Sequence, residues 1–354
     1  MNFKKAPFPW FGGKSKAAPA VWAALGDCAH YVEPFAGSIA VLLNRPHEAN
    51  RTYHSETVND LDGLLVNAWR AIQLHPDATA EAASNPVAEA DLHARHLALV
   101  RWRDEHQLEH LMGDPAWCDP IMAGWWLWGI ACWIGSGWCA GNQPWTADAD
   151  GRLYKQGRGK VRPPGVSRQL PHLGNDGQGV NHAGLREPGV DYHPVTMPRL
   201  RTWFAWLSAR LRHVRVLNGD WRRCLTGGAC KTLSVRQGLG PCGVFLDPPY
   251  ADTASRTSDL YAVDSLTVAH AVREWALARG DDPLYRIVLA GFQGEHGTGL
   301  VDAGWREVEW YAAGFLSGGM GNTRGAGEQH QQRRERLWCS PHCLGAGIPG
   351  GLFA

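Results

Sequence analysis

The sequence lacks the marks of several broad classes of protein. Its nine cysteines are scattered among 354 residues and include no CxxC pair, which disfavours both a disulfide framework and a zinc site. No apolar run of the signal-peptide type follows Met1. We therefore expect free thiols, no metal ion and a cytoplasmic location.

Uninterrupted apolar stretches are also missing. Residues 120–147 carry no charged side chain and are rich in tryptophan, but glycines interrupt them at positions 124, 129, 135 and 137. A membrane span needs about 20 mainly apolar residues, and tryptophan favours the membrane interface over its interior. The segment is therefore expected to form a buried helix of a folded protein.

The chain as a whole has no excess of either charge, since its formal net charge is +1. The distribution is nevertheless uneven. Residues 145–240 hold 16 Lys and Arg against 6 Asp and Glu, a net charge of +10, so the remainder of the chain stands at −9. Such asymmetry favours a basic surface for a polyanion, although a solvated basic surface is the plainer alternative.

What the sequence does contain is an alternation of short apolar strands with helical patterns. Strands are expected at residues 30–33, 54–59, 214–217, 243–246, 286–290, 305–310 and 336–339. Helices are expected at residues 38–44, with Ser38 as a candidate cap, and at 201–211 and 266–279. A further helix is indicated by apolar residues at helical spacing, namely Leu61, Leu64, Leu65 and Ala68. The alternation predicts an α/β fold with a mostly parallel sheet.

Acidic residues lie at or just after four of the expected strands. They are Glu33, Asp60, Asp220 and Asp247. In parallel sheets, ligands bind beyond the carboxyl ends of the strands. These four residues are therefore expected to belong to one site.

The most informative motif is Asp247-Pro248-Pro249-Tyr250, which follows an apolar strand. The two prolines remove two N–H donors and leave carbonyls as the main backbone groups. The Asp247 carboxylate and the Pro248 carbonyl can each accept one N–H of an adenine N6 amine, while Tyr250 stacks on a base flipped out of its duplex. A rigid turn after a strand is the alternative.

Two glycine-containing loops precede this motif. Gly12-Gly13-Lys14 lacks the spacing of a P-loop, because Phe8 stands where the first glycine is needed. The loop at residues 33–38 is not GxGxxG either. Both loops still permit close backbone approach to a ligand, and Asp60 is placed to accept from ribose hydroxyls.

In their order along the chain, five elements resemble the Dam-like (D12 class) N6-adenine DNA methyltransferases, and their phage and prophage branch in particular. The elements are Trp10-Phe11-Gly12-Gly13-Lys14, Glu33-Pro34-Phe35-Ala36-Gly37-Ser38, Asn59-Asp60, Gly219-Asp220-Trp221 and Asp247-Pro248-Pro249-Tyr250. The resemblance implies a Rossmann-like methyltransferase fold built from residues 1–70 and 211–354. It also implies an inserted helical and irregular target-recognition region at residues 71–210, and a bacterial or phage-infected cell as the location.

The resemblance further implies a role for each matching residue. S-adenosylmethionine would be bound by Trp10, Gly12, Gly13, Lys14, Glu33, Phe35, Ala36, Gly37, Asp60, Asp220 and Trp221. The target adenine of DNA would be held by Asp247, Pro248, Pro249 and Tyr250. DNA phosphates would meet Arg152, Lys155, Arg158, Lys160, Arg162 and Arg168 of the insertion. Two positions depart from the family: Ile39, where a small residue is usual, and Trp221, where Phe is frequent.

Other interpretations of the same residues stay open. Enzymes of this fold can also methylate adenine in RNA or the N4 amine of cytosine. Asp247 favours adenine only because the family usually has Asp there in adenine-specific enzymes, and no physical argument excludes cytosine. A DNA-binding protein with a decayed methyltransferase scaffold is a second alternative, against which the intact motif at 247–250 argues. A small-molecule or protein methyltransferase is a third, and the basic insertion argues against it.

Overall fold

The computed structural model describes residues 4–10, 12–46, 55–105, 117–133, 138–139, 145–147, 153–155, 196–230, 238–249, 268–296, 298–310 and 335–345. The chain divides into two compact units. The first comprises residues 1–12, 60–219 and 257–264, and the second comprises residues 13–59, 220–256 and 265–354.

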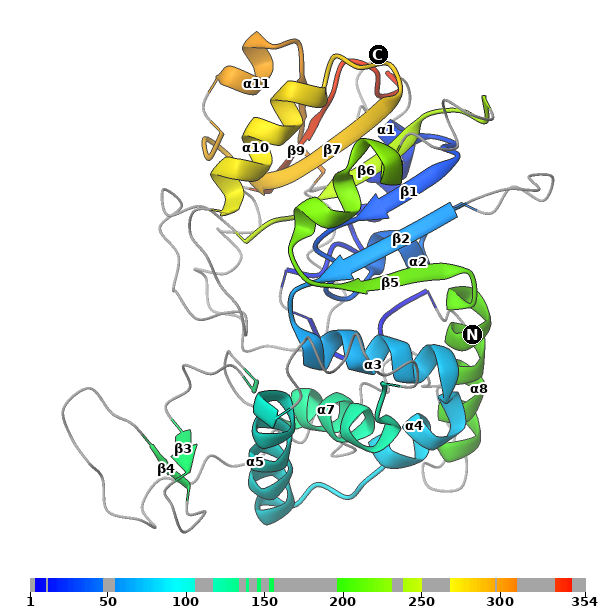
Figure 1. Cartoon of the computed structure of the whole chain (residues 1–354), viewed down its shortest axis with the longest axis vertical. Coiled ribbons are helices and arrows are strands. Elements are labelled where there is room, and N and C mark those ends of the chain that lie inside the picture. Colours follow the sequence, from blue (N-terminus) through cyan, green and yellow to red (C-terminus); the bar gives the residue numbers. More distant parts are fainter. Residues whose placement is uncertain are drawn as a thin grey trace, which may run out of the picture. The chain divides into compact units, whose positions relative to one another are not determined.

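Seven strands form one mostly parallel sheet in the order β5-β2-β1-β6-β7-β9-β8 (Figure 1). They are β1 (His30–Glu33), β2 (Ser55–Asp60), β5 (Val214–Asn218), β6 (Cys242–Leu246), β7 (Tyr285–Phe292), β8 (Arg306–Val308) and β9 (Glu335–Cys339). β1 pairs in parallel with β2 and β6, and β6 pairs in parallel with β7. β9 pairs antiparallel with both β7 and β8. The predicted α/β fold with a mostly parallel sheet is thus confirmed.

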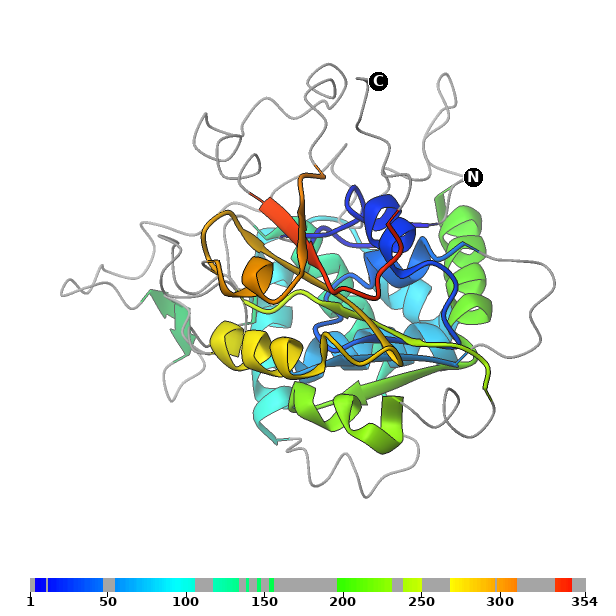
Figure 2. The same cartoon turned by 90° about the horizontal axis from the view of Figure 1, so that it is seen from above.

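β6, a central strand of the second unit, has the apolar sequence Cys-Gly-Val-Phe-Leu because both faces of the sheet are covered. Every residue of β1 and of β6 is buried. The helices α1 (Ala18–Leu25) and α10 (Val268–Arg279) both pack against β7. Figure 2 shows these two helices on opposite faces of the sheet. A short helix, α11 (Gly299–Asp302), precedes β8.

The turn after β1 differs from the expectation. Helix α2 comprises Ala40–Leu43, its N-cap position is Ile39, and no side chain caps it, so the prediction of Ser38 as the cap is wrong. Ile39 has φ 45°, in the left-handed region that β-branched residues rarely adopt. Glycine adopts this conformation without steric cost, whereas Ile39 does not.

The first unit contains five described helices around a tryptophan-rich core. They are α3 (Gly63–Leu74), α4 (Pro76–Ala83), α5 (Glu89–Glu105), α7 (Pro120–Cys132) and α8 (Thr196–Leu211). In the same unit, β3 (Trp145–Ala147) pairs antiparallel with β4 (Leu153–Lys155). α3 begins only after its N-cap Asp62, so Leu61 lies outside the helix and is 53% exposed, contrary to the prediction. A helix cap of this kind is set by local side-chain hydrogen bonds, which apolar spacing does not report.

Helix α7 is the buried helix that the tryptophan-rich segment predicts. Trp126 and Trp128 are fully buried, and α7 packs against α3, α4 and α5. Gly124 permits the approach of α4, because a Cβ at this position would collide with Ala82. Within the described ranges, no helix is both long and apolar enough to cross a membrane.

Candidate active site

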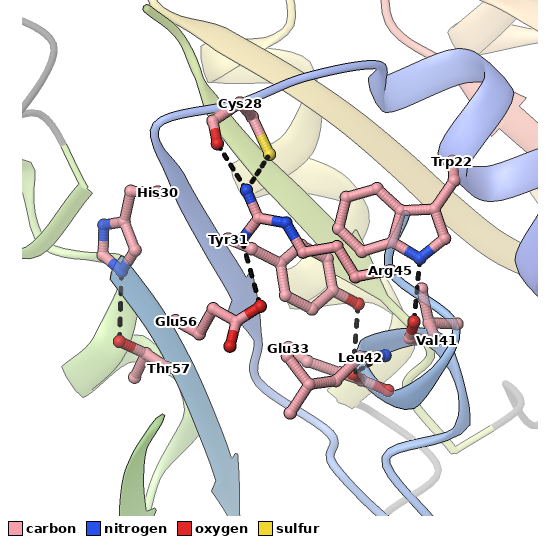
Figure 3. A network of polar contacts seen from close by, with 10 residues as sticks. All are labelled: Trp22, Cys28, His30, Tyr31, Glu33, Val41, Leu42, Arg45, Glu56 and Thr57. Carbon is pink, nitrogen blue, oxygen red and sulfur yellow. Dashed lines mark hydrogen bonds and ion pairs between the residues drawn. The ribbon is translucent and has the colours of Figure 1, made fainter. Parts of the chain in front are cut away.

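Glu33, the last residue of β1, connects the strand end to the helix beyond the following loop. Its Oε2 accepts hydrogen bonds from the Tyr31 hydroxyl at 3.0 Å and from the Leu42 backbone N–H at 3.3 Å (Figure 3). Tyr31 and Glu33 share one face of the strand because they are two residues apart. The carboxyl group therefore holds the loop of residues 34–39 between two regular elements.

The Glu33 carboxyl is buried, and this changes its protonation. Burial raises the pKa of Glu33 to about 8, while the Tyr31 and Leu42 hydrogen bonds oppose the rise and the nearby Asp247 and Glu56 carboxylates add to it. Burial also raises the pKa of Tyr31 well above its ordinary value. In the folded protein without ligand, Glu33 is thus mostly neutral near pH 7.

This shift predicts a pH-dependent difference between the wild type and a Glu33→Gln variant. The carboxyl titrates near 4.5 in the unfolded chain and near 8 in the folded one, so its protonation favours the folded state below 4.5. That contribution is lost as the pH rises from 4.5 to 8, because the unfolded chain releases the proton at a lower pH than the folded one. The free energy of unfolding of the variant should therefore exceed that of the wild type increasingly between these values. Urea denaturation at several pH values measures it, and a pH-independent difference would contradict the prediction.

Asp247 leaves the end of β6 and forms an ion pair with Lys14. The distance from Lys14 Nζ to Asp247 Oδ2 is 3.0 Å, and the side chains are 5% and 21% exposed. Burial raises the pKa of Asp247, and the Lys14 ammonium opposes that rise. No described residue donates a hydrogen bond to the other oxygen, Oδ1. Pro248 is buried and Pro249 is half-buried. Because proline has no backbone N–H, the two residues that follow the carboxylate offer carbonyl acceptors and no backbone donor.

The short 3-10 helix η2 (Trp221–Leu225) begins with Trp221, and Asp220 is its N-cap. The rings of Phe35 and Trp221 lie 6.0 Å apart between centroids at 34°. Trp221 is 5% exposed, and its indole N–H is buried without a partner among the described residues. Asp220 accepts from the backbone and the side chain of Arg222, with Oδ2 at 3.1 Å from Arg222 Nη1.

These motifs have a counterpart among known families. Residues 10–107 match the D12 class N6 adenine-specific DNA methyltransferases. The match spans the Lys14 loop, Glu33 and Asp60, whereas Asp220 and Asp247 lie outside it. It indicates a DNA adenine N6-methyltransferase and therefore implies a methyl donor and a DNA substrate. Comparison with curated proteins finds no match.

Three of the residues expected for the D12 class site belong to the first unit. Trp10 is half-exposed and packs against Phe8 and Trp126, with ring centroids 5.9 and 6.4 Å away. Gly12 has φ 73°, which suits glycine. Asp60 Oδ1 accepts from the Asp62 backbone N–H at 3.0 Å. Their contact with a methyl donor stays a prediction.

The DNA-contacting residues expected for a D12 class enzyme lie almost entirely outside the described residues. Lys155 ends β4. Tyr250 and the remaining basic residues are not described, namely Arg152, Arg158, Lys160, Arg162 and Arg168. Among the described residues, no cluster of three or more His, Cys, Asp or Glu is suited to a metal ion.

Sequence reasoning missed several side chains that act on this candidate site. Tyr31 could have been found from its place two residues before Glu33, and Arg222 from its place two residues after Asp220. Glu295 and Glu335, whose charges act on Asp247, gave no such signal. They come from the turn after β7 and from β9, and only the strand order brings them to the same edge as Asp247.

Proposed function

We propose that this protein transfers a methyl group from S-adenosylmethionine to the N6 amine of an adenine flipped out of DNA. The observation that carries the proposal is the Asp247 carboxylate at the end of buried β6. Lys14 holds one of its oxygens, and the donor-free Pro248-Pro249 backbone follows it. The family match over residues 10–107 supports the choice of adenine in DNA.

The residues of the second unit fit the adenine end of this methyl donor. An adenine ring needs an aromatic surface, an acceptor for its amine and donors for its ring nitrogens. Phe35 and Trp221 provide apolar rings, Asp220 provides the acceptor, and the Trp221 indole N–H is a buried donor without a described partner. Ala36, whose N–H donates to Asn59 O at 2.8 Å, and Gly37 complete the loop after Glu33.

Each polar group of the Asp247 motif would have a defined role in the reaction. S-adenosylmethionine supplies an electrophilic methyl group on a positively charged sulfur. Asp247 Oδ1 and the Pro248 carbonyl would each accept one N–H of the target amine, which directs the nitrogen lone pair at the methyl carbon. As the N–C bond forms, the C–S bond would break to leave the neutral thioether S-adenosylhomocysteine, and the amine would release one proton to Asp247 or to solvent. Orientation and a preorganised negative group contribute most of the rate enhancement in such a site. The alternatives, adenine in RNA and cytosine N4, need the same acceptors.

The test is methyl transfer from labelled S-adenosylmethionine to unmethylated DNA, followed by mass spectrometry of the nucleosides. N6-methyladenine in the product supports the proposal. N4-methylcytosine, or transfer only to RNA, would replace the proposed substrate. Absence of any methylated nucleoside despite measurable cofactor binding would overturn the proposed DNA methyl transfer.

Arg222 contacts both Asp220 and Trp221, the two residues that are proposed to bind the adenine of the cofactor. Its Nη1 is bonded to Asp220, and its guanidinium lies 4.8 Å from the centroid of the Trp221 ring. Both charged side chains are more than half exposed, and such pairs contribute about 0.2–1 kcal/mol. We therefore expect Arg222→Ala to tighten S-adenosylmethionine binding by about two- to fivefold, measured by calorimetry.

The matched control for this prediction is Arg223→Ala, since Arg223 is also exposed and lies in the same 3-10 helix. It should leave the dissociation constant unchanged. Weaker binding in Arg222→Ala would mean that Arg222 supports the cofactor rather than competing with it.

A further inference from the structure

Lys14 is the most deeply buried lysine of the described site, and its ammonium group meets the carboxylate of Asp247. Its side chain is 5% exposed, and the Nζ to Oδ2 distance is 3.0 Å. The Lys14 carbonyl accepts from the Ala18 N–H at 2.9 Å, so the residue is anchored to the start of α1. A buried ammonium group next to a carboxylate holds that carboxylate in one orientation and in its charged form.

Among the described residues, three carboxyl groups act on Asp247 or lie near it. Glu33 comes from the end of β1, Glu295 from the turn after β7, and Glu335 from β9. The Glu295 carboxylate is directed back to its own turn, where Oε2 accepts from the Phe292 N–H at 2.7 Å. Like charges at one edge of a sheet favour protonation of one of them. Lys14 is the cation that opposes this tendency at Asp247.

Protonation or rotation of Asp247 would remove the acceptor that the proposed reaction needs. A carboxylate accepts at both oxygens, whereas a protonated carboxyl is a donor at one of them. With Oδ2 held by Lys14, Oδ1 is the oxygen that takes no hydrogen bond from a described residue. We infer that Lys14 is a positioning residue of methyl transfer, which keeps Asp247 ionised and aims Oδ1 at the target amine. This inference rests on the proposed function.

The inference differs from the role that the family resemblance implies for Lys14. A ligand of the methionine end of the cofactor would act on cofactor affinity. A residue that acts through Asp247 would act on the methyl-transfer step and leave the affinity for the cofactor nearly unchanged. The two roles are therefore separable by measurement on a single set of variants.

The experiment compares Lys14→Met with Lys16→Met, a matched control two residues away whose side chain is exposed. Single-turnover methyl transfer is measured at saturating S-adenosylmethionine and DNA, and the dissociation constant of the cofactor is measured by calorimetry. We expect Lys14→Met to lower the single-turnover rate by about 10²-fold, as loss of one preorganised electrostatic contact does in other enzymes. The dissociation constant should change by less than a few-fold, and Lys16→Met should behave as the wild type.

The pH profile distinguishes positioning from a merely structural role. Without the ammonium group, burial and the surrounding carboxyls act on Asp247 unopposed, so its pKa rises further. In Lys14→Met, the acid limb of the plot of single-turnover rate against pH should move to higher pH. Part of the lost activity should therefore be recovered in alkaline buffer. Lys14→Arg, which keeps the charge, should retain the wild-type limb.

A double-mutant cycle keeps the inference testable if Lys14→Met is less stable. In the Asp247→Asn background, Lys14→Met should cause no further loss of rate, because the two residues act as a unit. A rise in the dissociation constant with an unchanged rate, a loss equal at every pH, or full additivity in the cycle would each overturn the inference. Absence of transfer by the wild type would instead overturn the proposed function.

Discussion

Asp247→Ala is expected to reduce methyl transfer by at least about 10²–10³-fold while S-adenosylmethionine binding stays within a few-fold of the wild type. The change removes the carboxylate that would accept from the target amine, while Phe35, Asp220 and Trp221 are untouched. Single-turnover transfer to DNA and calorimetry with the cofactor measure the two quantities separately.

Two further variants serve as controls for this result. Asp281→Ala removes a fully exposed carboxylate from the turn after α10, and it should have no effect on transfer. Asp247→Asn keeps the shape of the side chain and should be nearly as inactive. It serves as a control for misfolding, because Asp247→Ala removes an ion-pair partner of the buried Lys14 ammonium. Loss of cofactor binding in a folded Asp247→Asn variant would contradict the division between acceptor and cofactor site.

The second large effect is expected from Arg45→Met. Arg45 is 4% exposed, and its guanidinium bonds Glu56 at 3.1 Å and the Cys28 carbonyl at 2.6 Å (Figure 3). It also lies 5.3 Å from the centroid of the Trp22 ring. Arg45→Met removes the cation that pairs with the buried Glu56 carboxylate, and breaking a buried ion pair costs about 3–5 kcal/mol. Urea denaturation should show this decrease in the free energy of unfolding.

The control for Arg45 is Arg201→Met, which breaks an exposed ion pair with Glu81 at 3.7 Å. Exposed pairs contribute about 0–1 kcal/mol, so this variant should remain close to the wild type. Adding Glu56→Leu to Arg45→Met should restore part of the lost stability, since it removes the buried carboxylate that has lost its ion pair with Arg45. Equal effects of the two arginine variants would show that burial of the pair is not the cause.

This buried pair matters to function through the elements that it connects. Arg45 follows α2, Glu56 belongs to β2, and Cys28 precedes β1. The loop with Phe35, Ala36 and Gly37 lies between β1 and α2, and the Glu33 carboxyl ties the two together at Leu42. A loosened α2 is therefore expected to weaken cofactor binding as well as stability.

Much of the fold was predictable because parallel strands that are buried on both faces leave a local apolar signature. β1, β6 and β7 were predicted within two residues of their ends, and the helix at 266–279 matches α10 closely. The boundaries at Ser38 and Leu61 were wrong because backbone conformation and capping decide where a helix begins, and apolar spacing does not report either.

The sequence by itself determined the chemistry of the candidate site: an acidic residue at the end of each of several strands, and two prolines that leave carbonyls as acceptors. Only the tertiary structure decided which charges act on that chemistry. Lys14 and Asp247 are more than 200 residues apart in the chain, and Glu335 reaches the site on a strand that enters the sheet antiparallel between β7 and β8. Such pairings depend on strand order, which is set by packing between distant segments, so no local pattern encodes them.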